Sequence, residues 1–139
     1  MEQGKRSRDN TVVQERAILV GCLLPNIKVN PHDPLDELRA LAEAVNAQVV
    51  DEVLQQRVRP DPATFIGSGK VEEIAEIVKA RQADVVIFDN DLSPTHIANI
   101  EEIVNCKVLD RSELILDIFA ARARTTESKL QVEIGRAHV

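Results

Sequence analysis

The first candidate for chemistry is a short stretch with two glycines and a lysine. Gly67, Ser68, Gly69 and Lys70 lie together in TFIGSGKVEEI, and Gly-x-Gly-Lys is half of a phosphate-binding loop. Backbone amides of such a loop can wrap a nucleotide's phosphates, and its lysine can neutralise their charge. These four residues are therefore the candidate nucleotide or phosphate site of this chain.

The rest of the loop pattern is missing. A complete loop has a glycine five residues before the Gly-Lys pair and a Ser or Thr after the lysine to hold Mg²⁺. Thr64 and Val71 occupy these positions, and Glu72 stands where a dinucleotide-binding pattern needs its third glycine. We favour a structural turn from a strand into a helix, with both glycines giving the backbone freedom and Ser68 as the helix cap. On this reading, Gly69→Ala lowers the melting temperature.

The second candidate is Asp89, which follows a short apolar strand in VVIFDNDLSP. This position resembles the phosphoacceptor of response-regulator receivers. That chemistry needs an acidic pair after the first strand to hold Mg²⁺, whereas the first apolar run ends in VGCLL. We favour turn chemistry leading to a helix cap at Ser93.

The remaining reactive side chains are scattered. His32, His96 and His138 have no catalytic Ser or Cys beside them in the pattern, and we expect solvated histidines. Cys22 and Cys106 lie in separate predicted strands without metal-ligand spacing, and we expect buried, reduced thiols. The sequence predicts no catalytic residues and no metal site.

Basic residues concentrate at one place on an acidic chain. The net charge is −6, and residues 60–107 hold 4 Lys and Arg against 9 Asp and Glu. Arg122, Arg124 and Lys129 stand among small residues in IFAARARTTESKLQVE. An acidic body opposes contact with phosphate backbones over the whole surface, so an RNA contact must be local. These three residues are the candidates for it.

Apolar periodicity predicts the elements that carry these residues. We expect strands over 16–24, 47–58, 84–88 and 107–109, the second at an edge or with a bulge. We expect helices from Asp33-Pro34, from about Val71, from Ser93-Pro94 and from about Ser112. This alternation predicts an α/β fold with a small, mostly parallel four-stranded sheet, helices on both faces and a long C-terminal helix. No apolar run is long enough for a membrane span, and the polar N-terminus, MEQGKRSRDN, lacks the apolar stretch of a signal peptide. We therefore expect a cytoplasmic protein.

Four stretches in order carry a family resemblance: TFIGSGKVEEI, VVIFDNDLSP, LDRSELILDIF and ARARTTESKLQVE. From about residue 16 to Glu133 the chain resembles the N-terminal domain of HflX-type ribosome-associated GTPases. The resemblance implies an α/β body, then a helical hairpin, and a GTPase domain that uses GTP and Mg²⁺. It also implies binding to the ribosome, above all to rRNA of the large subunit, and splitting or rescue of ribosomes. Some members of the family are reported to bind ATP, and the resemblance would place such a site at Gly67–Lys70.

The resemblance sets the expected boundaries. We expect a flexible leader over 1–14, the α/β subdomain over 15–110, the first arm of a truncated hairpin over 111–133, and a non-native tail over 134–139. The end, EIGRAHV, departs from the family and resembles the translation of a sequencing adapter. Without a GTPase domain, the chain is predicted to be inactive in GTP hydrolysis. The alternative function is a receiver-like or nucleotide-sensing signalling domain, with Asp89 or Lys70 at its site.

Overall fold

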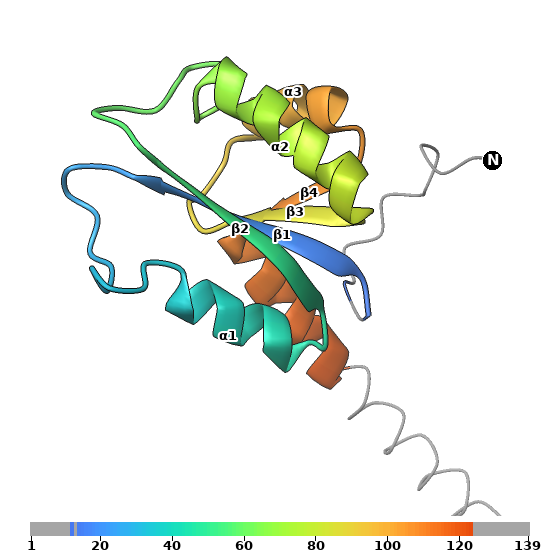
Figure 1. Cartoon of the computed structure of the whole chain (residues 1–139). Helices are drawn as coiled ribbons and strands as arrows, with labels where there is room; N and C mark the ends of the chain where they lie inside the picture. Colours follow the sequence, from blue (N-terminus) through green and yellow to red (C-terminus); the bar gives the residue numbers. More distant parts are fainter. Residues whose placement is uncertain (1–11, 13, 124–139) are drawn as a thin grey trace, which may run out of the picture.

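The computed structural model describes residue 12 and residues 14–123. Its centre is a four-stranded sheet with strand order β2-β1-β3-β4, and every neighbouring pair is parallel (Figure 1). The predicted α/β fold is confirmed, and within the described range a helix over 111–123 follows the last strand. The elements are β1 (Arg16–Leu23), α1 (Asp36–Ala44), β2 (Gln48–Gln56), α2 (Ser68–Arg81), β3 (Val85–Phe88), α3 (Pro94–Val104) and β4 (Lys107–Asp110).

The central strands are apolar without interruption because both of their faces are covered. Ala17 and Leu19 of β1 point into one core cluster, while Ile18 and Val20 point into the other. The same alternation divides the buried residues of β3 between the two clusters.

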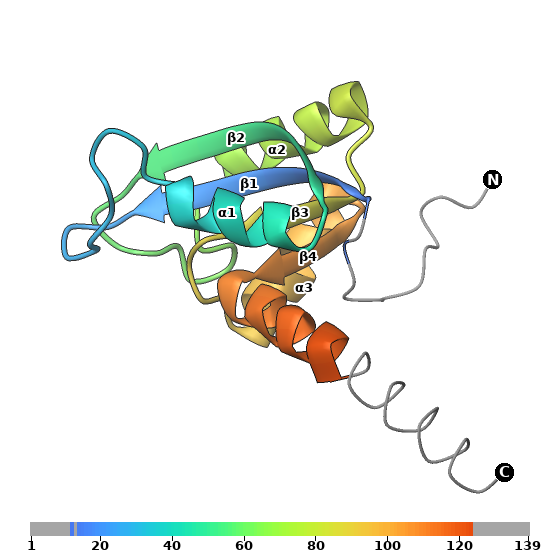
Figure 2. The same ribbon diagram turned by 90° about the horizontal axis from the view of Figure 1, so that it is seen from below.

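Helices cover both faces of this sheet. Figure 2 shows α1 and the 111–123 helix on one face, with α2 and α3 on the other. Leu38 of α1 and Leu114 of the 111–123 helix are fully buried on the first face. Ile74 of α2 and Ile100 of α3 are fully buried on the second. The predicted apolar stripes of α1, α2 and α3 are the faces that pack on the sheet.

Strand β2 is an edge strand and also carries an irregularity. Its pairing with β1 shifts register between Ala17, opposite Val49, and Ile18, opposite Asp51. Val50 is thus the extra residue of a bulge, which bends the exposed edge. Both features were predicted from the broken alternation of this segment.

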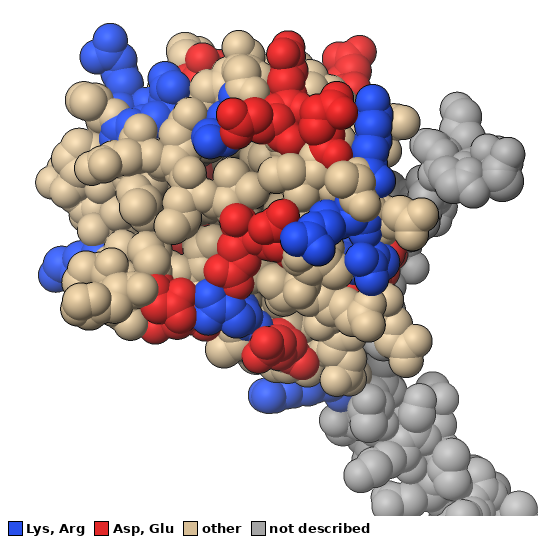
Figure 3. Space-filling model, in the orientation of Figure 1, with Lys and Arg blue, Asp and Glu red and all other residues tan. Residues whose placement is uncertain are grey.

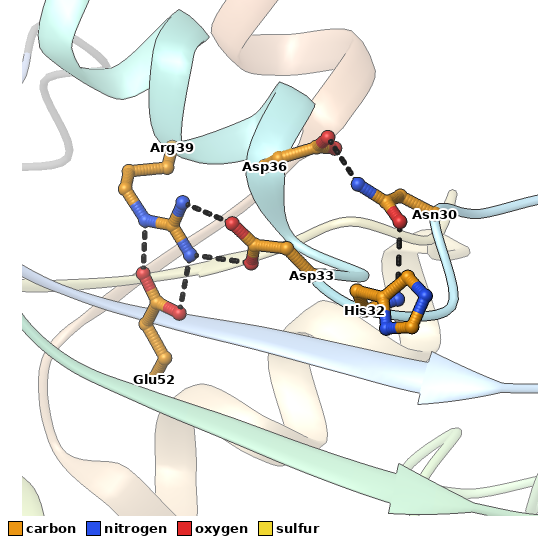
Figure 4. A network of polar contacts seen from close by, with 6 residues as sticks. All are labelled: Asn30, His32, Asp33, Asp36, Arg39 and Glu52. Carbon is orange, nitrogen blue, oxygen red and sulfur yellow. Dashed lines mark hydrogen bonds and ion pairs between the residues drawn. The ribbon is translucent and has the colours of Figure 1, made fainter.

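The start of α1 differs from the prediction. The helix begins at Asp36, and the N-cap residue, Leu35, makes no side-chain cap. Asp33 does not cap because both of its carboxylate oxygens accept hydrogen bonds from Arg39, at 2.9 Å each. Arg39 also donates to Glu52 of β2, at 2.6 and 2.8 Å (Figure 4). The sequence pattern alone could not predict that Arg39, one turn into the helix, would bind the Asp33 carboxylate.

Two residues of the expected leader contact the α/β body. Val12 is fully buried, and the backbone N–H of Gln14 donates to the carbonyl of Asn46 at 2.7 Å. The expected boundaries of the subdomains stay predictions. Residues 1–11, residue 13 and residues 124–139 lie outside the described residues, and with them most of the leader, the rest of the hairpin arm and the tail. None of the described helices is long and apolar enough to cross a membrane.

Candidate functional site

The Gly67–Lys70 stretch forms the first turn of α2. Gly67 is the N-cap with φ −60° and ψ 145°, Ser68 is already helical, and no side chain caps the helix. The prediction of Ser68 as the cap is therefore wrong by one position. Neither glycine has positive φ; the left-handed residue of this turn is Phe65, with φ 65°.

Two of the groups that a nucleotide could use here are already engaged. The Gly67 N–H donates to Oε1 of Gln55 at 2.9 Å, and the Lys70 ammonium pairs with Glu73 at 2.9 Å. A cradle that wraps phosphates needs several consecutive free amides. The geometry therefore fits a strand-to-helix turn better than a nucleotide site.

An arginine that sequence reasoning missed lies beside this turn. A Cβ added at Gly67 would lie 3.2 Å from Nη1 of Arg57, so the guanidinium borders the start of α2. The Arg57 Nε also donates to the carbonyl of Arg59 at 3.0 Å. The available signal was the Arg-Val-Arg sequence directly after β2, which places two cations at the end where parallel strands lead into helices.

The ends of β1 and β3 form a crevice, which is where α/β sheets most often bind ligands. The chain leaves these two neighbouring strands in opposite directions across the sheet, so a space opens between their carboxyl ends. A pocket of about 460 Å³ lies there. Its lining is Ile27, Lys28, Val29, Asn30, Pro34, Asp36, Glu37, Asp89 and Arg111.

Asp89 is held in this crevice by an ion pair. Arg111 donates to Asp89 at 3.1 Å and to Glu37 of α1 at 2.8 Å. Burial raises the pKa of Asp89 above its usual value, and Arg111 partly offsets this rise. The structure thus gives Asp89 a structural partner, and the described residues contain no group of three or more His, Cys, Asp or Glu able to hold a metal ion. This arrangement does not fit a receiver-type phosphoacceptor.

Two further polar residues, Asn90 and Asp110, form hydrogen bonds at the carboxyl ends of the strands. The buried Asn90 side chain accepts from the Cys22 N–H at 2.8 Å and donates to the Cys22 carbonyl at 3.0 Å, as a neighbouring strand would. The buried Asp110 accepts from the N–H groups of Leu92 and Glu113, at 2.9 Å each, and so caps the 111–123 helix. The contacts of Asn90 with Cys22 and of Asp110 with Leu92 join residues far apart in sequence, whereas the cap of Glu113 by Asp110 is local. None of them was predicted.

The histidine prediction needs one correction. His96 is the third residue of α3, and it exchanges hydrogen bonds with Ser93 in a capping box. Its ring also meets Phe65 edge-to-face at 5.3 Å. The expected Ser93 cap is confirmed. His32 is exposed, with its backbone N–H donating to Asn30 (Figure 4), and His138 lies outside the described residues.

Of the candidate RNA contacts, the structure places Arg122. It is exposed near the end of the 111–123 helix, while Arg124 and Lys129 lie outside the described residues. Cys22 is a buried free thiol whose pKa is raised by burial, and Cys106 is a partly exposed free thiol.

Comparison with known proteins connects this fold to a family. Residues 32–120 match the family model described as GTP-binding GTPase N-terminal. The chain belongs to this family. It is 40% identical over 127 residues to the GTPase HflX of Flavobacterium psychrophilum, covering 91% of this chain and 31% of that protein. It is 43% identical over 122 residues to the GTPase HflX of Escherichia coli, covering 88% and 28%.

Solved structures agree with this assignment to the family. A GTP-binding protein from the archaeon Sulfolobus solfataricus, in complex with GDP, is similar with a TM-score of 0.56 and 25% identity, covering 76% of this chain and 30% of that one. The complex of SsGBP and GDP is similar with a TM-score of 0.60 and 27% identity, covering 88% and 34%. The resemblance to the N-terminal domain of HflX-type GTPases is confirmed, and this chain spans about three-tenths of the curated relatives' length.

Proposed function

We propose that this chain is a ribosome-binding N-terminal domain of an HflX-type GTPase. Its partner is the large ribosomal subunit and its rRNA, in the cytoplasm, and the full-length protein splits or rescues ribosomes. The observation that carries this proposal is the family match over residues 32–120. The ribosome as partner comes from the resemblance to HflX-type ribosome-associated GTPases.

The proposal assigns binding, and not catalysis, to the described residues. GTP and Mg²⁺, which the family implies, do not fit them: the Gly67 N–H is occupied by Gln55, and Lys70 is paired with Glu73. Val71 stands where a Mg²⁺-binding hydroxyl would be required. We therefore expect no GTP hydrolysis by this chain, and the same geometry argues against ATP binding at Gly67–Lys70.

The expected rRNA contact lies on the C-terminal helix. Arg122 is exposed there, and a guanidinium can donate two parallel hydrogen bonds to a phosphate. Arg124 and Lys129 follow it in the sequence and complete the predicted contact. Because such contacts release counterions, binding should weaken steeply with salt.

Co-sedimentation with purified ribosomes tests the proposal. Replacing Arg122, Arg124 and Lys129 together by Gln should greatly reduce the amount of chain that sediments, because three phosphate contacts are lost. Lys79→Gln is the matched control, because Lys79 is an exposed cation at the far end of α2. Failure of the unmodified chain to sediment at low salt would contradict the proposal, and equal losses in both variants would reject these three residues as the contact.

A further inference from the structure

The α/β body carries a basic patch of its own, away from the C-terminal helix. Arg57 lies beside the start of α2, Lys70 lies in its first turn, and the exposed Arg59 stands in the connection from β2. We call these three residues the α2-start patch. Figure 3 shows Lys and Arg side chains gathered at the upper left, over the connection between β2 and α2 seen in Figure 1. Such a concentration is notable on a chain whose net charge is −6.

The geometry of the patch leaves positive charge at the surface. Within the described residues, no carboxylate forms an ion pair with Arg57 or Arg59, whereas Arg39, Arg81 and Arg111 each pair with at least one. The nearby Asp61 accepts hydrogen bonds from the N–H groups of Ala63 and Thr64, which lower its pKa. The charge of Arg57 adds to this lowering of the Asp61 pKa, so Asp61 offsets part of the charge of Arg57, while Arg59 is exposed.

Access to the patch is open. Gly69 lies in the first turn of α2, and a Cβ added there would meet nothing within 4 Å. The positive end of this 14-residue helix lies close to the Arg57 guanidinium, whose Nη1 would be 3.2 Å from a Cβ at Gly67. Lys70 adds a third cation, although Glu73 holds its ammonium at 2.9 Å. The positive end of α2 and the neighbouring cationic side chains thus favour binding of an anion at the exposed start of this helix.

We propose that the α2-start patch binds phosphodiester groups of RNA, as a second contact in addition to Arg122. This inference rests on the proposed function, which supplies RNA as the partner. A free nucleotide is disfavoured, because the Gly67 amide is occupied and the patch is an open surface with no enclosing cradle. An RNA strand needs no cradle, since its phosphates can follow exposed cations along a surface.

Fluorescence anisotropy of a labelled 20-nucleotide oligouridine, titrated with the full chain, tests the proposal. The double variant Arg57→Gln with Arg59→Gln should lower affinity by roughly tenfold at low salt and reduce the log–log salt slope by about 2. Lys79→Gln should leave affinity and slope near those of the unmodified chain. Glu73→Gln should tighten binding, because it releases the Lys70 ammonium.

The outcomes separate this proposal from the function on which it rests. An unchanged salt slope in the double variant, with its melting temperature preserved, would overturn the α2-start patch as an RNA contact. If oligouridine binding depends on the patch while ribosome binding is absent, the inference stands and the proposed function fails. Tight ATP binding that needs Arg57 and Arg59, with RNA binding unaffected, would assign the patch to a nucleotide instead.

Discussion

The three described glycines differ in the space around them. A Cβ at Gly21 would lie 2.8 Å from Cδ2 of the buried Leu35 and 3.1 Å from Leu54, whereas Gly69 has open space. Gly21→Ala should therefore lower the free energy of unfolding by about 1–3 kcal/mol. Gly69→Ala should leave it unchanged or raise it by up to about 1 kcal/mol, since alanine favours the helix. Chemical denaturation of both variants checks this, and a clear loss of stability in Gly69→Ala would contradict it.

The reasoning behind the expected loss from Gly69→Ala fails, because the left-handed residue of the turn lies elsewhere. Phe65 carries the positive φ, and Gly69 is an ordinary helical residue. Ser93, in contrast, was predicted correctly, since a cap followed by proline depends only on local sequence. Arg57 and Asn90 could not be assigned roles, because their neighbours come from distant segments.

Asp89 makes the free energy of unfolding of this chain depend on pH. Burial raises its folded-state pKa above the usual 3.8, so above that pH the folded state holds more protons here than the unfolded state. The stability that this group contributes is complete below pH 3.8 and is lost as pH rises through the folded-state pKa. Asp89→Asn should therefore gain stability relative to the unmodified chain as pH rises from roughly 3 to 6. Denaturation at several pH values measures this, with the exposed Asp91→Asn as control; a constant difference would argue against it.

At the scale of elements, α3 depends on the capping box at its start. Ser93 accepts a hydrogen bond from the His96 N–H at 3.1 Å. Ser93→Ala should cost about 1 kcal/mol in the free energy of unfolding, because one N–H of the first turn loses its partner. Thr95→Ala, an exposed change in the same turn, should cost much less. Equal effects of the two changes in thermal melts would show that the cap does not hold this helix.

The 111–123 helix packs through fewer residues than its apolar pattern suggested. Helical spacing would let Leu114, Ile115, Ile118 and Phe119 all face the body, but Phe119 is 59% exposed whereas Leu114 is fully buried. Leu114→Ala should therefore cost about 2–5 kcal/mol, as large-to-small changes in cores do. Phe119→Ala should cost well under half as much. Denaturation midpoints decide the matter, and a larger loss at Phe119 would mean that its ring packs on the body.

Sequence pattern predicted elements well where they are buried on both sides and less well at their ends. The apolar runs of β1 and β3 require a covered parallel sheet, so the fold class followed from them. The strand order β2-β1-β3-β4 and the later start of α1 depend on packing and on the contacts of Arg39, which span separate elements. The crevice between β1 and β3 likewise exists only once that order is known.

At the scale of the whole molecule, charge is distributed unevenly. The chain is acidic overall, yet exposed cations occupy the start of α2 and the end of the 111–123 helix. An RNA-binding surface confined to such places would bind through few phosphate contacts and depend strongly on salt. Acidic residues elsewhere on the surface would repel RNA and limit the ways in which the domain can sit on it.

The central claim is that this domain recognises the large ribosomal subunit, and direct titration of isolated subunits tests it most directly. Labelled chain would be titrated with purified large and small subunits at two salt concentrations. We predict saturable binding to the large subunit that weakens as salt rises and is far stronger than binding to the small subunit. Equal binding to both subunits, or no binding to the large subunit at low salt, would contradict the account.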